Sequence, residues 1–341
     1  MGGPRPRLRV VVKSALAGVL AAALVGVTVH AHRGAAKPGP APQVFAFLSA
    51  AGGTELEHLR RYGPRISVLA PNWYQLNLPT QSLSGGPVPT VVTLARAAGA
   101  QLWPVINARL ATGEAIGGIN QRRRIAAAIA VEAARRGYQG MTLDIEPLPE
   151  SESRAFDALV AAVAARLHIQ HERLAVYVAR RTSQGGVQAY DWPTLLDSTD
   201  LLIASGYDEH SADSRPGPIT TATGFEDMLD YAATLSLSRV VPAIGAFGYA
   251  WPVRGGPGQF ISTIAANALR TQTGARLRGA RGDASFVADG LIVHYQNTPA
   301  LIARARDARA LGMRWLALFS LGREPDTFWA GITTARQGDG G

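Results

Sequence analysis

Residues 140–146 of the sequence, GMTLDIE, carry two carboxylic acids at alternate positions, Asp144 and Glu146. Side chains alternate between the two faces of a β-strand, so a strand here places Thr142, Asp144 and Glu146 on one face. Two carboxyl groups this close on a buried face do not both ionise easily. One is then held protonated near neutral pH, as a general acid requires. An exposed acidic strand end is the alternative, but it does not explain acids inside an apolar run.

Eight short apolar segments recur along the chain and alternate with helical segments. The predicted strands span 43–49, 65–76, 101–108, 140–146, 173–179, 200–207, 239–249 and 314–322. The predicted helices lie near 54–62, 90–99, 118–136, 151–167, 191–197, 224–236 and 299–311, with a last one after Asp326. Many strands are almost continuously apolar, which is typical of strands buried on both faces. Eight such units predict a (β/α)8 barrel. The alternative, a doubly wound sheet, lacks a G-x-G-x-x-G turn after the first strand.

The barrel also predicts where the two acids lie. Asp144 and Glu146 end the fourth strand, which Pro147 stops, and active sites of such barrels form at this carboxyl end. Residues 254–297 are more than a connection between strands seven and eight needs, and they predict a small α+β insertion. The barrel is expected to span 43–331, followed by a disordered polar tail at 332–341.

The fourth-strand segment resembles a known signature. YQGMTLDIE (138–146) is similar to the Asp-x-x-Asp-x-Asp-x-Glu motif of glycoside hydrolase family 18, which includes chitinases and spore-cortex N-acetylglucosaminidases. The four acidic positions of that motif read Gln139, Thr142, Asp144 and Glu146 here. The last two acids, which the chemistry of the family most needs, are kept.

Other segments resemble the same family in the same order along the chain. SGYDEH is similar to its sixth-strand Met-x-Tyr-Asp motif, and AIGAFGYAW to its seventh-strand motif. LALFSLGREPDTFW resembles its eighth strand, with Phe319 where tryptophan is usual. APNWYQLN and LWPVIN resemble the second and third strands of the spore-germination branch. The resemblance covers residues 43–329.

The resemblance implies a retaining hydrolysis in which the 2-acetamido group of the substrate acts as the nucleophile. It makes Glu146 the residue that protonates the leaving oxygen and later activates water. It makes Asp144 the residue that orients the acetamido group and stabilises the charged intermediate. Tyr207 then donates a hydrogen bond to the acetamido carbonyl, and Asp208 supports it.

Seven residues are candidate substrate contacts, and two of them, Asp208 and Thr142, lie next to the catalytic residues in the motifs above. The resemblance implies that Trp251, Phe319 and Tyr74 offer aromatic faces on which sugar rings stack. Arg180 ends the predicted fifth strand, on the same side of the barrel as the acids. His210 follows Asp208 closely and is placed at the mouth of the site.

Two departures from the family motif bear on activity. Thr142 replaces an acid that normally shares a proton with Asp144, and so leaves a weaker hydrogen-bond partner. Gln139 replaces the outermost acid of the motif. Both changes are expected to lower activity or to shift its pH optimum, while neither removes the acid/base residue. We interpret them as the mark of a subfamily.

The N-terminal region carries most of the excess positive charge. Six of the 34 Lys and Arg residues lie in the first 40 residues, which contain no acid; the rest has 28 basic and 25 acidic residues. A basic start followed by an uncharged apolar run at 14–29 predicts a signal peptide or signal anchor over 1–32. A Pro/Ala-rich linker is expected at 33–42. This distribution favours a membrane partner, through the N-terminal helix, and not nucleic acid.

Two hypotheses of different class follow. The first is an exported glycosidase at the cell membrane, or secreted if the N-terminal segment is cleaved, that hydrolyses a β-linked polymer containing N-acetylglucosamine. Its substrate is then peptidoglycan, a chitin-like polymer or a β-1,6-linked polymer, and no cofactor or metal is expected. The second is a non-catalytic, lectin-like barrel, and a scaffold for other envelope enzymes is a weaker third. The chain has no cysteine, which excludes disulfides and a thiol nucleophile.

Overall fold

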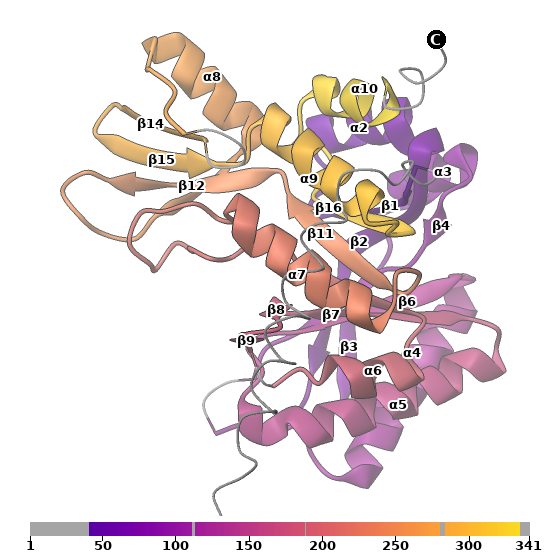
Figure 1. The fold of residues 1–341 in the computed structure, drawn as a ribbon. Coiled ribbons are helices and arrows are strands. Elements are labelled where there is room, and N and C mark those ends of the chain that lie inside the picture. Colours follow the sequence, from indigo (N-terminus) through magenta and orange to yellow (C-terminus); the bar gives the residue numbers. More distant parts are fainter. Residues whose placement is uncertain (1–40, 111–112, 188, 280–283, 335–341) are drawn as a thin grey trace, which may run out of the picture. The chain divides into compact units, whose positions relative to one another are not determined.

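The computed structural model describes residues 41–110, 113–187, 189–279 and 284–334, which belong to one compact unit. Eight parallel strands form a closed barrel within this range (Figure 1). They are β1 (Gln43–Leu48), β2 (Ile66–Asn77), β5 (Val105–Ala108), β6 (Gly140–Ile145), β7 (Arg173–Val178), β10 (Leu201–Ser205), β11 (Val240–Gly245) and β16 (Trp315–Phe319). Each strand pairs with the next, and β1 pairs with both β16 and β2, which closes the ring. The predicted (β/α)8 barrel is therefore confirmed.

Helices follow the strands and cover the outside of the barrel (Figure 1). They are α2 (Gly53–Tyr62), α3 (Pro89–Ala98), α4 (Ile119–Arg136), α5 (Ser153–Ile169), α6 (Trp192–Ser198), α7 (Ala222–Leu235), α9 (Thr298–Ala310) and α10 (Asp326–Thr334). Short elements complete the connections: η1 (Gly63–Arg65), β3 (Ser82–Gly85), β4 (Gln101–Leu102), η2 (Glu150–Glu152), β8 (Arg181–Thr182) and β9 (Gly185–Gly186).

The alternation of side chains along each strand separates two apolar layers. On β6, Met141, Leu143 and Ile145 are fully buried among the side chains that face the helices. Thr142 lies on the opposite face, toward the interior of the barrel, where rings such as those of Phe45 and Trp103 pack together. The strand is therefore buried on both faces, and its polar residues face the interior of the barrel.

The insertion between the seventh and eighth barrel strands is a second, antiparallel sheet with one helix. It consists of β12 (Phe247–Pro252), β13 (Gln259–Ser262), α8 (Thr263–Thr273), β14 (Ala284–Ala288) and β15 (Leu291–Tyr295). Asp289 and Gly290 join β14 to β15 in a two-residue turn, and both have positive φ, as this tight hairpin requires.

This insertion begins earlier than the sequence predicts. The expected seventh strand, 239–249, is in fact two strands: β11 ends at Gly245, and β12 pairs with β13 and β15 outside the barrel. The inserted sheet therefore starts at Phe247 and not at residue 254. Residues 247–251 are apolar because they pack within that sheet and against the barrel mouth.

The predicted targeting segment, 1–32, lies outside the described residues, as do most of the linker and of the tail. Helix α10 continues through Thr334, so it extends past the expected end of the barrel at 331. Among the helices that the structure describes, none combines the length and the apolar character needed to cross a membrane.

Candidate active site

A pocket of about 300 Å³ lies at the carboxyl end of the barrel strands. It brings together five of the residues singled out in the sequence: Asp144, Glu146, Tyr207, Asp208 and Phe319. The remaining lining residues are Phe47, Tyr177, Phe247, Tyr249, Phe260 and Arg323. Its volume is near the lower end of the range for ligand pockets, about 300–1,000 Å³. Carboxyl groups thus face a mainly aromatic cavity.

Local packing fixes the end of β6 that carries the two acids. Gly140, the first residue of the strand, has no room for a side chain, because a Cβ atom there would lie 2.6 Å from the Trp103 ring. At the other end, the Tyr190 hydroxyl donates a hydrogen bond of 2.9 Å to the Ile145 carbonyl. The Glu146 amide donates to the Ala108 carbonyl of the neighbouring strand over 3.0 Å. The backbone between the acids is therefore held from both sides.

The two acids differ in how strongly they retain a proton. Burial raises the pKa of Glu146 to about 8, and the negative charges of Asp144 and Asp208 add to this effect, while Arg109 opposes it. Burial alone raises the pKa of Asp144 to about 6. At neutral pH, Glu146 is therefore mainly protonated and Asp144 mainly ionised. This division of states gives the pair one proton donor and one anion.

Tyr207 and Asp208 reach the pocket from the turn after β10. Gly206 lets this turn pass close to β11, because a Cβ atom there would lie 2.4 Å from the Ala243 carbonyl oxygen. Burial keeps the pKa of Tyr207 well above its usual value, so the hydroxyl stays available as a donor. Asp208 has a φ of 68° and is exposed to water on one side, at the mouth of the pocket, while protein packs around its other side. These surroundings raise its pKa to about 6.

The two departures from the family motif have structural partners. Thr142 is fully buried, and its hydroxyl donates to the Trp103 carbonyl over 2.9 Å, so this proton is not available to Asp144. The Gln139 side chain accepts a hydrogen bond from the Leu102 amide and donates to the Gly137 carbonyl. Neither residue lines the pocket, so the expected contact between Thr142 and the substrate is not found.

Tyr74 lies away from the pocket, which corrects the prediction that it stacks on a sugar. The residue is 2% exposed, and its hydroxyl donates to Glu132 over 2.8 Å and is bonded to the Tyr138 hydroxyl over 2.9 Å. The pairing of β2 with β5 shifts register between Asn72 and Tyr74, as in a β-bulge. Tyr74 consequently packs in the apolar layer beneath the helices.

Replacement of Tyr74 by phenylalanine tests this placement. The variant Tyr74→Phe loses a hydrogen bond to a carboxylate, so we expect its free energy of unfolding to fall by about 1–2 kcal/mol. Its kinetic constants on any substrate should stay at the wild-type values, because the ring is outside the pocket. Denaturant unfolding and steady-state kinetics on the same preparation check both points. A rise in KM with unaltered stability would place Tyr74 in the substrate site after all.

Three other candidate contacts also lie outside the pocket lining. Trp251 is 1% exposed and packs between Tyr249 and His294 in the inserted sheet. Arg180 forms an ion pair of 2.8 Å with Glu209. The ring nitrogen Nδ1 of His210 is 2.9 Å from the Pro218 carbonyl oxygen. Each of these side chains is therefore engaged with protein groups, and the structure does not bring them to the acids.

Several residues that line the pocket were not among those predicted from the sequence. Tyr177 and Phe47 occupy alternate, inward positions near the ends of their strands, a signal that strand parity could have given. Tyr249 lies two residues before Trp251 on the same strand, and it lines the pocket instead. Phe260 belongs to β13, which only the fold of the insertion brings to the mouth. Arg323 follows the eighth strand inside a motif already noted.

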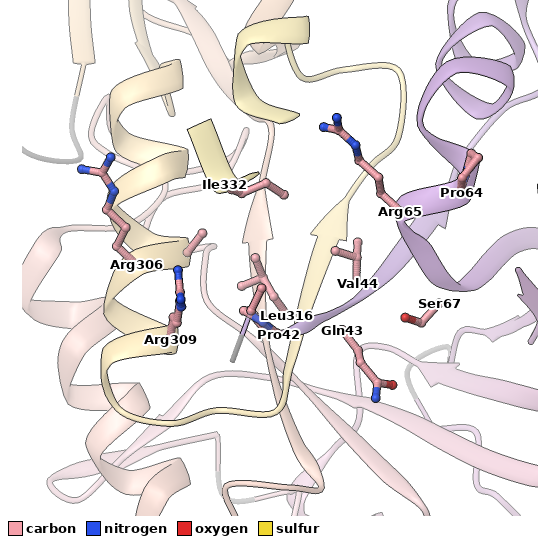
Figure 2. Close-up of a pocket in the computed structure, with 12 residues that line it drawn as sticks. Pro42, Gln43, Val44, Pro64, Arg65, Ser67, Arg306, Arg309, Leu316 and Ile332 are labelled. Atoms are coloured by element: carbon pink, nitrogen blue, oxygen red, sulfur yellow. The ribbon is translucent and has the colours of Figure 1, made fainter. Parts of the chain in front are cut away.

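A second pocket, of about 380 Å³, lies at the opposite end of the barrel, where β1, β2 and β16 begin (Figure 2). Its charged lining residues are Arg65, Arg306 and Arg309, and it has no carboxyl group. It therefore cannot supply the acid–base pair. In the described part of the chain, no group of three or more His, Asp or Glu side chains is placed to hold a metal ion.

Comparisons with known proteins agree with this architecture. No protein-family model matches the chain. Over 213 residues, 59% of this chain and 62% of the relative, it is 20% identical to the uncharacterized glycosylase YvbX of Bacillus subtilis. The match thus spans less than two thirds of that protein.

Solved structures extend the likeness across the whole barrel. A chitinase of Chromobacterium violaceum has a TM-score of 0.78 and 22% identity, covering 87% of this chain and 100% of that one. The spore cortex-lytic enzyme SleL of Bacillus cereus has a TM-score of 0.74 and 14% identity, covering 87% and 74%. The fold expected from the resemblance to glycoside hydrolase family 18 is therefore confirmed. In sequence and in fold, the chain is similar to glycoside hydrolases.

Proposed function

We propose that this protein is an exported glycoside hydrolase that cleaves a β-linked polysaccharide containing N-acetylglucosamine. The observation that carries the proposal is the placement of Glu146 in the pocket beside Asp144, with a pKa raised to about 8 by burial and by neighbouring charges. A carboxyl group that is protonated at neutral pH, at the carboxyl end of the barrel, can give a proton to a glycosidic oxygen.

The reaction is proposed to retain configuration through assistance by the substrate. Glu146 protonates the leaving oxygen while the acetamido oxygen of the substrate attacks the anomeric carbon. The ionised carboxylate of Asp144 stabilises the cyclic cation that forms, and the neutral Tyr207 hydroxyl donates to the acetamido group. Glu146, now ionised, takes a proton from water, which opens the cation with the original configuration restored. Tyr207 and Phe319, with ring centroids 5.8 Å apart, offer apolar faces to the sugar.

A bacterial envelope glycan is the proposed polymer, either peptidoglycan or a chitin-like or β-1,6-linked polymer. Similarity to a spore cortex-lytic enzyme and to chitinases supports this range. The uncharged run 14–29 after a basic start supports export, with the barrel outside the cytoplasm or secreted. Fractionation of cells that produce the full chain, followed by external protease treatment, tests the location. Recovery in the cytoplasmic fraction, protected from protease, would refute export.

Product analysis tests the activity directly. The full chain is incubated with β-1,4 and β-1,6 oligomers of N-acetylglucosamine and with peptidoglycan, and the products are read by mass spectrometry. We expect shorter products from at least one substrate, and proton NMR should show the β-anomer as the first species released. Binding without cleavage of any substrate would favour the lectin-like alternative. Release of the α-anomer first would exclude the retaining mechanism.

A further inference from the structure

Arg323 places a cationic group in the wall of the pocket that holds the three acids. It follows β16, and its guanidinium carbon lies 4.3 Å from the centre of the Phe260 ring and 5.5 Å from that of Phe319. Phe260 in turn stacks on Phe247, with ring centroids 5.1 Å apart and an interplanar angle of 19°. The aromatic rings therefore hold the guanidinium group over an apolar surface, where cation–π attraction fixes its position.

The backbone that presents Arg323 is rigidly connected to its surroundings. The Arg323 amide donates to the Ser320 carbonyl, and its carbonyl accepts from the Ile264 amide of the insertion. The next residue, Glu324, is fully buried, and its Oε1 accepts from the Trp329 indole over 2.7 Å and lies 2.9 Å from His58 Nδ1. Hydrogen bonds therefore hold both the backbone of Arg323 and the side chain of the next residue, Glu324, unlike those of a surface arginine on a free loop.

The charge of Arg323 has no close counter-charge within the described residues. None of the ion pairs formed there involves its guanidinium group, and Glu55 attracts it only at longer range. Glu324 is engaged with Trp329 and His58 instead. Partial burial of a cation without a counter-charge is energetically unfavourable. A ligand that brings a negative charge next to the guanidinium group would therefore bind more tightly.

We propose that Arg323 is a specificity residue that binds a carboxylate carried by the glycan next to the bond that is cleaved. The inference rests on the proposed function, and it narrows the substrate to acidic glycans, such as those with a lactyl ether or a uronic acid. The planar guanidinium group matches a carboxylate through two parallel hydrogen bonds. Because Arg323 lines the pocket, a carboxylate on a bound glycan can reach its guanidinium group.

A matched pair of ligands tests the inference. Peptide-free oligosaccharides from peptidoglycan, with lactyl carboxylates, are compared with the same oligosaccharides after conversion of these groups to neutral methylamides. Binding to the full chain carrying Glu146→Gln is measured by calorimetry, so that no turnover is needed. We expect the acidic ligand to bind on the order of 10-fold more tightly. In the double variant with Arg323→Gln, the ratio of the two dissociation constants should fall to about one.

Two further variants separate a specific contact from a general charge effect. Arg323→Lys keeps the charge but loses the paired geometry, so an intermediate ratio is expected. Arg215→Gln removes one exposed arginine that does not line the pocket, and the ratio should stay at its original value. The inference is overturned if the two ligands bind equally, or if Arg323→Gln keeps the preference.

Cleavage of the same two ligands by the wild-type chain is scored separately. Preferential binding without any cleavage would contradict the proposed function but sustain the carboxylate site. Equal cleavage and equal binding of both ligands would sustain the function and contradict the site. The two ideas therefore fail in distinguishable ways.

Discussion

Replacement of Glu146 by glutamine should lower kcat by about 10²–10⁴-fold, the usual contribution of a general acid–base residue. Glutamine keeps the shape of the side chain and cannot release a proton to the glycosidic oxygen. Binding of an oligosaccharide that the wild type cleaves should be retained, because the aromatic walls of the pocket are unchanged. Steady-state kinetics for the loss and calorimetry for the binding check the two parts of this expectation.

Glu150→Gln is the matched control. Glu150 lies just beyond the same strand end, is exposed, and does not line the pocket. Its activity should equal that of the wild type. A Glu146→Gln chain that retains full kcat would assign the proton transfer to another group and would contradict the site as described.

The pH dependence of the stability of Glu146→Gln gives a second test, which a misfolded variant would not pass. The raised pKa means that native Glu146 holds its proton up to about pH 8, while the unfolded chain ionises near the ordinary value of 4.5. Ionisation of this group therefore costs the wild type stability as pH rises between these two values, and the glutamine variant lacks this contribution. We expect the variant to have the higher Tm at pH 8 and an equal Tm at pH 4.

The end of β6 shows how far the sequence alone could predict the site. The alternation of acids with Met141, Leu143 and Ile145 was sufficient, because a strand buried on both faces forces that parity. Parity also applies to the end of β7, where Tyr177 reaches the pocket. It did not separate Tyr74, because a local register shift in β2 turns that ring away, and no residue type marks the shift.

The inserted sheet is the part that the sequence could not place. The run from β11 into β12 is apolar throughout, so nothing in its composition marks where the chain leaves the barrel at Ala246. The contribution of Phe260 to the pocket depends on the pairing of β13 with β12 and on the packing of that sheet near the barrel. Both depend on tertiary contacts, which the local sequence does not reveal. The same holds for Arg323, whose role depends on the rings that happen to flank it.

The pH profile of kcat/KM should be bell-shaped, with limbs near pH 6 and pH 8. Activity needs ionised Asp144, whose pKa burial raises to about 6, and protonated Glu146, whose pKa is raised to about 8. Activity therefore falls as acid neutralises Asp144 and as base removes the proton of Glu146. Asp208 titrates near the acidic limb as well, so the limbs report the coupled group and not single residues.

Asp144→Asn should move the basic limb to lower pH. After burial, the charge of Asp144 is the largest cause of the raised pKa of Glu146, followed by that of Asp208. Removal of a neighbouring negative charge favours the ionised form of Glu146, so its pKa falls. Asp208→Asn should shift the limb in the same direction but less. Where turnover is too low, NMR titration of ¹³C-labelled glutamate carboxyl groups gives the pKa directly. An unmoved pKa in Asp144→Asn would mean that the two carboxyl groups do not interact, and the acid–base pair would then have to be abandoned.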